Sequence, residues 1–253
     1  MKDLRDFNLD KLNSATKYPP ILTYHKMGER GRLLPEVQVP LPTEVLVTEK
    51  VDGTNGRIVV VKTDSVEPYS QFLIGGKEEF LYAQGDLLFT AANGVAETLK
   101  PVAHLFPAGN RGITVYFVEV FGGRLPSSKQ YTKIGVIAYR IFDIADIDFD
   151  ILLKTVEEIA SWRDHGGQKF RIEEELLKPS LFSLGSLTPR LGKVVLPTSI
   201  EETMKAMQAY TESLCNLGGG LGKAEGIVVR TPDRSVIAKL RFEDYDRTLR
   251  ARK

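Results

Sequence analysis

Apolar residues gather in short runs separated by glycine, proline and charged residues, a pattern typical of strands joined by turns. Residues 44–62 predict two strands with a tight turn between them, and Lys50 stands at the end of the first strand, directly before Val51-Asp52-Gly53. Residues 112–121 and 134–144 are rich in β-branched and aromatic residues and predict two further strands.

Two helices follow from capping signals. Asp150 is expected to cap a helix over Ile151–Arg163. Ser199 is expected to cap a second helix over Ile200–Leu217, in which Glu202 completes a capping box, and Gly218 ends this helix. Ile200, Met204, Met207 and Leu214 form the apolar stripe of the second helix, which we interpret as core packing. Residues 86–106 predict a further, partly helical segment.

Strands outnumber helices, and the connections between them are short. Residues 224–231 and 235–242 predict a hairpin that turns at Pro232-Asp233. We therefore expect an α+β fold with largely antiparallel sheets and flanking helices. The 253 residues fit one domain, with an irregular, proline-containing lead-in over 1–42, a core over 43–242 and a tail over 243–253.

Composition narrows the class of protein only a little. The formal net charge of +1 neither indicates nor excludes a nucleic-acid-binding protein, because a local basic surface needs no overall excess of charge. Cys215 is the chain's single cysteine, which excludes an internal disulfide and fits a reducing compartment. No apolar run reaches the length of a membrane span, and the charged N-terminus lacks a signal-peptide core. We expect a soluble, cytoplasmic protein with no membrane partner.

Lys50 is the strongest candidate for chemistry, since a lysine at the rim of a strand can act as a nucleophile. Only about one free lysine in a thousand is unprotonated near neutral pH, so such a lysine needs partial burial and nearby cations. Carboxylates are needed as well if the electrophile is a phosphate that binds through a metal ion.

Later strands supply both kinds of residue. Lys239 and Arg241 share one face of a strand, where two cations suit a phosphate. Glu119, Asp143 and Glu225 each interrupt or begin an apolar strand, where an unpaired acid is costly. Taken singly, the acids are better explained as strand-end or salt-bridged residues, and the two cations as a solvated face of a hairpin.

Five short motifs in order change that balance. They are Lys50-Val-Asp-Gly-Thr-Asn55, Phe117-Val-Glu119-Val-Phe-Gly122, Tyr139-Arg-Ile-Phe142-Asp143, Glu225-Gly-Ile-Val-Val-Arg230 and Ala238-Lys-Leu-Arg241. The set resembles the covalent nucleotidyltransferases, the superfamily of ATP-dependent polynucleotide ligases and mRNA capping enzymes. DNA ligases and capping enzymes usually carry arginine where Asn55 stands, so the first motif is most similar to that of RNA ligases.

The resemblance implies a nucleotidyltransferase domain of ATP-grasp-like architecture. In it Lys50 would attack the α-phosphate of ATP, forming lysyl-AMP and releasing pyrophosphate. Glu49 would help to hold the adenine, Asp52 would place the reacting groups, and Asn55 would approach the leaving phosphates or the metal's water shell.

The later motifs would complete the nucleotide and metal site. Phe142 would stack on the adenine, and Asp143 would support the site. Glu119 would contact the ribose or a metal ion, and Glu225 would hold the Mg²⁺ or Mn²⁺. Lys239 and Arg241 would neutralise the α-phosphate and favour the unprotonated amine of the nucleophile.

Two departures from the family pattern bear on these roles. The family usually has an arginine in a short motif after the nucleophile; the corresponding stretch, residues 70–80, has none, and Lys77 is its expected substitute. About a dozen residues follow Arg241, so no OB-fold is expected, which disfavours capping.

The function that the resemblance implies is an ATP-dependent RNA ligase, active in RNA repair, that joins 3′-hydroxyl and 5′-phosphate ends of RNA. The alternatives are a minimal DNA ligase, an RNA guanylyltransferase, and a catalytically silent nucleic-acid-binding protein with the same fold. The glycine-rich run Gly218–Lys223 is not a phosphate-binding P-loop, because its spacing is wrong and no Ser or Thr follows the lysine. The three histidines are scattered without metal-ligand spacing.

Overall fold

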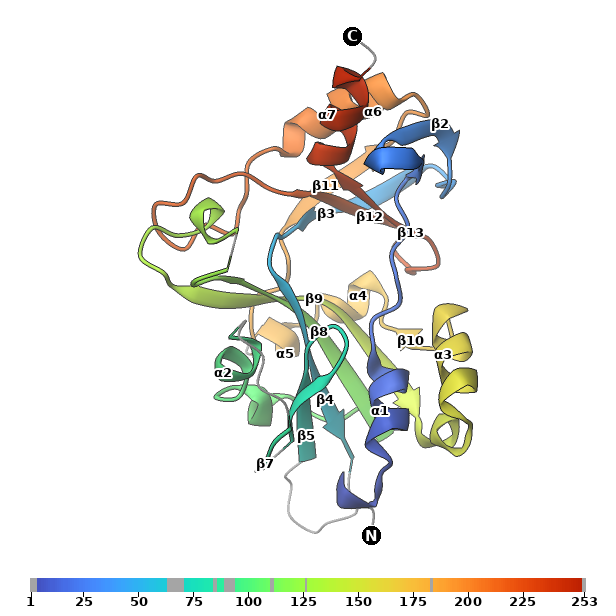
Figure 1. The fold of residues 1–253 in the computed structure, drawn as a ribbon, viewed down its shortest axis with the longest axis vertical. Coiled ribbons are helices and arrows are strands. Elements are labelled where there is room, and N and C mark those ends of the chain that lie inside the picture. Colours follow the sequence, from blue (N-terminus) through green and yellow to red (C-terminus); the bar gives the residue numbers. More distant parts are fainter. Residues whose placement is uncertain are drawn as a thin grey trace.

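The computed structural model describes residues 4–62, 71–83, 86–88, 94–109, 112–125, 127–182 and 184–251. Within these ranges the strands form a seven-stranded sheet (β10-β9-β8-β4-β5-β6-β7), a four-stranded sheet (β11-β3-β12-β13) and a two-stranded sheet (β1-β2). Neighbouring strands in all three are antiparallel, as the sequence predicts. In Figure 1 the larger sheet lies below the four-stranded sheet, and the N- and C-termini lie at opposite ends of the molecule.

The larger sheet is covered on both faces. Its strands are β4 (Thr54–Val61), β5 (Gln71–Gly75), β6 (Phe80–Ala83), β7 (Asp86–Leu87), β8 (Gly112–Gly122), β9 (Ile137–Asp148) and β10 (Lys169–Phe170). Along β4, Ile58 and Val60 pack on one face, with α2 (Val95–Leu99), α4 (Glu173–Leu176) and α5 (Pro179–Phe182). Val59 and Val61 pack on the other, with α1 (Leu9–Thr16) and α3 (Val156–Asp164). Because β4 is buried on both faces, its residues 58–61 are all apolar instead of alternating with polar residues.

The four-stranded sheet consists of β3 (Glu44–Lys50), β11 (Arg190–Val195), β12 (Gly226–Arg230) and β13 (Ile237–Arg241). One face packs against α6 (Ile200–Met207), α7 (Phe242–Arg250), β1 (His25–Met27) and β2 (Leu33–Val37). Alternation along β13 buries Ala238 and Leu240 and leaves Lys239 and Arg241 on the opposite face, as predicted. That face looks toward the larger sheet (Figure 1).

The chain passes from one sheet to the other directly after Lys50. β3 belongs to the smaller sheet and β4 to the larger, so the prediction of two strands is confirmed but they do not form a hairpin. Gly53 lies in this crossing, where a Cβ would come within 2.2 Å of the Val120 carbonyl oxygen. The glycine after Asp52 is thus required by close packing of the crossing on β8.

Several predicted elements differ at their ends. The predicted helix over Ile151–Arg163 begins only at Val156, because Thr155 rather than Asp150 forms the capping box, with Glu158. Ser199 caps α6 as predicted, and its hydroxyl accepts a hydrogen bond from the Glu202 N–H. The helical region ends at Tyr210 instead of Leu217. Leu214 is consequently exposed, and the buried Cys215 lies in a loop.

The lead-in and the tail are more ordered than the sequence suggested. Residues 1–42, predicted as irregular, contain α1, β1 and β2, and residues 243–250 belong to α7. His25 shows why this region orders: it is buried and bonds to Tyr245 of α7 at 2.7 Å. The helical part of the predicted segment 86–106 is α2 and a 3₁₀ turn over Ala103–Leu105. None of the helices in the described part of the chain is long and apolar enough to cross a membrane.

Candidate active site

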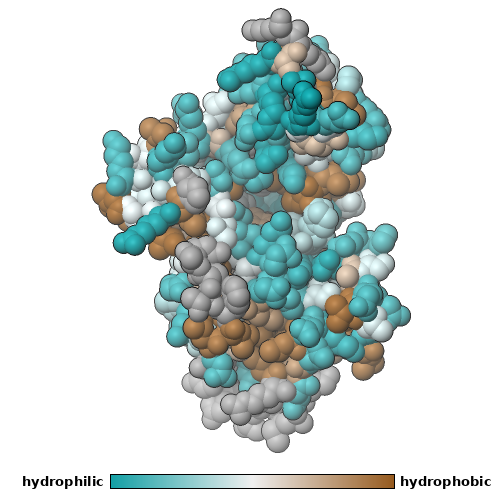
Figure 2. All heavy atoms as spheres, in the orientation of Figure 1, coloured by the Kyte–Doolittle hydropathy of each residue, from teal (hydrophilic) through white to brown (hydrophobic). Residues whose placement is uncertain are grey.

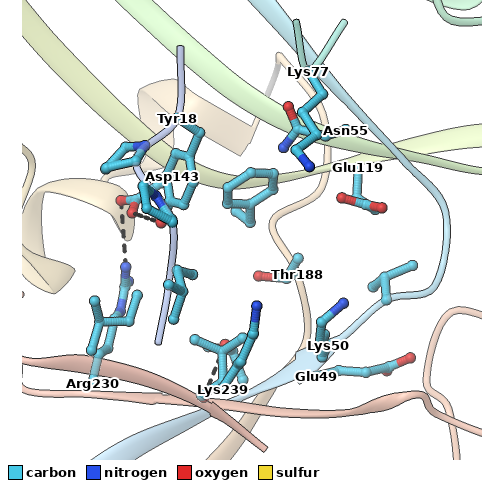
Figure 3. Close-up of a pocket in the computed structure, with 18 residues that line it drawn as sticks. Tyr18, Glu49, Lys50, Asn55, Lys77, Glu119, Asp143, Thr188, Arg230 and Lys239 are labelled. Atoms are coloured by element: carbon cyan, nitrogen blue, oxygen red, sulfur yellow. Dashed lines mark hydrogen bonds and ion pairs between the residues drawn. The ribbon is translucent and has the colours of Figure 1, made fainter. Parts of the chain in front are cut away.

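A cavity of about 360 Å³ lies between the two larger sheets (Figure 3). It is lined by residues of both sheets and of the segment that follows α1: Tyr18, Pro19, Pro20, Ile21, Thr48, Glu49, Lys50, Val51, Asn55, Lys77, Glu119, Phe142, Asp143, Thr188, Val228, Arg230, Ile237 and Lys239. Eight of the predicted site residues are in this lining; Asp52, Glu225 and Arg241 are not.

Lys50 reaches the cavity from the end of β3. Its side chain is 25% exposed, and its Nζ forms an ion pair with Glu225 Oε2. The sheet register explains this contact, since Lys50 is opposite Gly226 at the start of β12, directly after Glu225. The predicted nucleophile and the predicted metal-binding acid are therefore adjacent although 175 positions separate them in sequence.

Glu49 and Asp52, on either side of the predicted nucleophile in sequence, are held by two loops, 211–224 and 123–136. Glu49 is buried, and its carboxylate accepts from the Ser213 hydroxyl and from the Leu214 N–H at 2.8 Å. The Asp52 N–H donates to the Tyr131 hydroxyl at 2.6 Å. Each carboxylate oxygen of Glu49 accepts one of these bonds, so the side chain is held in place and keeps acceptor capacity for a further donor.

Glu119 stands opposite Lys50 across the cavity, on β8 (Figure 3). Burial raises the pKa of its carboxyl to about 8; Lys50 acts in the opposite direction, and Glu225 and Asp52 add to the rise. The side chain is therefore largely protonated at neutral pH when no cation is bound. A divalent cation would replace that proton.

Glu119 and Glu225 fit a magnesium or manganese ion chemically. Their charges interact in the cavity region, and Mg²⁺ is usually bound by one or two carboxylates together with phosphates and waters. Among the described residues no cluster of three His, Cys, Asp or Glu side chains forms a complete protein cage. The arrangement is thus suited to a metal that arrives with a phosphate ligand.

The two cations of β13 differ in what they contact. Lys239 points into the cavity beside Lys50 (Figure 3). Burial lowers the pKa of Lys239, and the charges of Lys50 and Arg241 lower it further. Arg241 instead forms a bidentate pair with Asp244 of α7, at 2.8 and 2.9 Å. Lys239 is therefore the β13 cation available to a phosphate in the cavity.

Phe142 and Asp143 are neighbours with different environments. Phe142 lines the cavity and meets the Tyr18 ring edge-on, with centroids 5.0 Å apart. Asp143 is buried and accepts from the Tyr18 hydroxyl at 2.9 Å and from Arg234 Nε at 2.7 Å. Arg230 Nη1 lies 3.5 Å from the same carboxylate. Asp143 thus joins β9 of the larger sheet to the β12–β13 hairpin of the smaller one.

Asn55 and Lys77 approach from the larger sheet. Asn55 is paired with Glu119 in the β4–β8 register, and Lys77 follows β5 with its side chain 82% exposed. In Figure 3 both side chains face Lys239 and Lys50 across the cavity. Ser70, the first residue of the stretch 70–80, lies outside the described residues.

Sequence reasoning gave no role to Tyr18, Thr188 or Arg230, which also line the cavity. Arg230 ends an apolar strand, and a charged residue at such a position needs a partner if it is buried. The sequence therefore carried a signal for this residue. Its partners are Asp143 and Glu173, and Glu173 also binds Arg190 of β11 at 2.9 Å. Tyr18 and Thr188 carried no comparable signal.

The model of the RNA ligase family matches residues 43–242. The chain belongs to the RNA ligase family. The match has the same bounds as the predicted core, and the family predicted from the five motifs is confirmed. No curated protein sequence matches the chain significantly.

Solved structures confirm the fold. A glutamate-to-alanine variant of Naegleria gruberi RNA ligase with ATP and Mn matches with a TM-score of 0.54 and 17% identity, over 92% of this chain and 62% of that one. The same enzyme with PPi matches with a TM-score of 0.52 and 17% identity, over 92% of this chain and 64% of that one. A lysine-to-alanine variant with ATP and Mn matches with a TM-score of 0.51 and 17% identity, over 90% of this chain and 62% of that one. This chain therefore spans less than two thirds of the length of these ligases.

Proposed function

We propose that this protein is an ATP-dependent RNA ligase that joins a 3′-hydroxyl to a 5′-phosphate through a lysyl-AMP intermediate. The observation that carries the proposal is the position of Lys50 Nζ, at a cavity between the sheets, in contact with Glu225 and opposite Glu119. Family membership and the ATP, Mn and PPi named for the Naegleria structures support it.

In the first step the Lys50 amine loses a proton and attacks the α-phosphate of ATP. A bond from Nζ to phosphorus forms, the bond from phosphorus to the bridging oxygen breaks, and pyrophosphate leaves. Glu225 Oε2, in contact with the amine, is placed to accept the proton. Lys239, beside Lys50, offsets the negative charge that builds on the phosphate.

The nucleoside would lie where the segment after α1 closes the cavity. Phe142, Pro20, Ile21 and Val228 supply apolar surface there, and Phe142 offers a ring for adenine stacking. Glu119 and Glu225 would hold Mg²⁺ or Mn²⁺, which when bound supplies charge neutralisation and orients the phosphates. AMP would then pass from Lys50 to the 5′-phosphate of RNA. Attack by the 3′-hydroxyl on that phosphate would join the ends and release AMP.

Transfer of label from ATP to the protein tests the first step. The protein is incubated with ATP labelled at the α-phosphate and with Mg²⁺, and the label that survives denaturing electrophoresis is measured. We expect label on the wild type, none on Lys50→Ala, and loss of the label when pyrophosphate is added. Equal labelling of Lys50→Ala, or no labelling of the wild type, contradicts the proposal.

The ends that the protein joins are tested with the same preparation. Nicked RNA duplex, nicked DNA duplex and single-stranded RNA are offered together with ATP and Mg²⁺, and sealed products are separated by length. We expect sealing of RNA ends. Sealing of DNA alone would indicate a DNA ligase, and transfer of GMP from GTP would indicate a guanylyltransferase.

A further inference from the structure

Loops 123–136 and 211–224 form a projecting lobe beside the cavity, seen at the left in Figure 1. Backbone bonds join the two loops: the Leu217 N–H donates to the Tyr131 carbonyl at 2.7 Å, and the Gly222 N–H to the Gln130 carbonyl at 2.9 Å. A Cβ on Gly220 would come within 2.3 Å of the Gln130 oxygen. The glycine-rich run thus allows two loops to pack closely and makes the lobe an ordered surface.

The lobe is basic although the whole chain is nearly neutral. Its charged side chains are all exposed: the cations Arg124, Lys129, Lys133 and Lys223, and the acid Glu212. Among the described residues the ion pairs within 4 Å involve other cations. The lobe therefore presents to solvent cations that form no ion pair among the described residues.

Exposed apolar side chains accompany these cations. Ile134, Leu214 and Leu221 are 77%, 61% and 62% exposed. In Figure 2 hydrophobic and hydrophilic residues are interspersed on the part that projects at the left. An unpaired nucleic-acid strand offers both matching surfaces, because its phosphates are anionic and the faces of its bases are apolar.

Four contacts connect the lobe to the residues around Lys50. Tyr131 and Ser127 bond to the backbone of Asp52, at 2.6 and 2.7 Å, and Ser213 and Leu214 bond to Glu49. The chain then leaves the lobe at Ala224 and places Glu225 against Lys50. A strand held on the lobe therefore lies next to the nucleophile.

We propose that the lobe is the binding surface for the RNA strand whose end reacts at Lys50, with Lys129, Lys133 and Lys223 contacting its phosphates. This inference rests on the proposed function for the identity of the strand. It predicts that the three lysines contribute to RNA binding and not to the transfer of AMP to the protein, because none of them lines the cavity.

The test replaces Lys129, Lys133 and Lys223 together by glutamine. The matched control replaces Lys154, Lys178 and Lys205, which are also exposed and lie outside the lobe: before α3, between α4 and α5, and in α6. Binding of a fluorescent, 5′-phosphorylated single-stranded RNA is measured over a range of salt concentrations, and labelling from ATP is measured without RNA.

We expect the lobe variant to bind RNA ~100-fold more weakly in 0.1 M salt and its log–log salt slope to fall by about 2, since each phosphate contact to a single strand contributes about 0.7. The control variant should bind RNA as the wild type does. The wild type, the lobe variant and the control variant should all take the same amount of label from ATP. Unchanged RNA binding by the lobe variant, or an equal loss in the control, overturns the inference.

The readouts separate this inference from the proposed function. A wild type that binds RNA through the lobe but takes no label from ATP contradicts the ligase proposal and leaves the surface assigned. A wild type that labels but whose RNA affinity does not depend on the three lysines contradicts the lobe alone. Concentration-dependent dimerisation that the lobe substitutions abolish, with RNA binding unchanged, would identify the lobe as a contact between copies and overturn the inference.

Discussion

Lys50 Nζ is bound to Glu225 Oε2, so the end of β3 and the start of β12 meet at one ion pair on the cavity wall. Both side chains are about three quarters buried. The pair holds the proposed nucleophile at the cavity before nucleotide binds, and the proton on Nζ is the one that must leave before attack. The carboxylate is thus both the partner of the resting amine and a candidate metal ligand.

Replacing Glu225 by glutamine should lower label transfer from ATP by at least ~100-fold, because the amide accepts no proton and binds Mg²⁺ poorly. The fold should be little affected, since glutamine keeps the size of the side chain and its amide oxygen can still accept a hydrogen bond from Lys50 Nζ. Single-turnover labelling and thermal unfolding are the measurements. A large loss of thermal stability with wild-type labelling would contradict the assignment.

The pH dependence of stability should report on Glu119. Burial raises the pKa of this carboxyl from 4.5 to about 8. Between these two values the unfolded chain has lost the proton that the native protein keeps, so the free energy of unfolding falls as pH rises through this window and levels above about 8. Glu119→Gln removes this loss and should be more stable than the wild type by ~1–3 kcal/mol at about pH 9, and equal to it near pH 4.

Urea unfolding of both proteins without divalent cations measures the difference. Mg²⁺ should reduce the difference at high pH, because the ion stabilises the ionised carboxylate. A constant offset between wild type and Glu119→Gln at all pH values would show that the carboxyl does not titrate abnormally.

The acid that joins the two sheets should matter for stability more than for chemistry. Asp143 is buried between Arg234, Arg230 and Tyr18. Asp143→Ala takes the carboxylate from Arg234 and leaves Arg230 with Glu173 alone, and should cost about 3–5 kcal/mol in the free energy of unfolding. Glu36→Ala, which breaks the exposed pair with Lys26, is the control and should cost less than about 1 kcal/mol. Equal losses in urea unfolding would contradict a clamping role.

The crossing between the sheets should be intolerant of a single methyl group. Gly53→Ala places a Cβ within 2.2 Å of the Val120 carbonyl oxygen, so the backbone after Lys50 has to move. We expect at least ~10-fold slower labelling, since a displaced nucleophile loses its alignment. Gly76→Ala is the matched control beside Lys77, where the nearest atom is 3.8 Å away, and should label normally.

The strands and the motif residues were predictable because each depends on local sequence. The alternation in β13 and the β-branched run of β8 are properties of a few neighbouring residues. The extent of the helix after Ser199 was not predictable: residues 211–217 keep a helical pattern, but their backbone bonds to the 129–133 loop and to Glu49 instead. Long-range hydrogen bonds overrode a local preference.

The order of the N-terminal segment was hidden for the same reason. Tyr18 looks like part of a proline-rich lead-in, yet it bonds to Asp143, 125 positions later, and closes one end of the cavity. Arg241 looks equivalent to Lys239 from its position in the strand, but Asp244 of α7 occupies its guanidinium. Neither difference is written in the spacing of residues along a strand.

The sequence by itself determined the family, the antiparallel α+β fold and the identity of most cavity-lining polar residues, because motif order and strand periodicity are local properties of the chain. The tertiary structure decided which side chains share the cavity, which cations are already paired, and which loops border the nucleophile. Most of those outcomes depend on contacts between residues far apart in sequence, such as Lys50 with Glu225 and Tyr18 with Asp143, which form only when the chain folds as a whole.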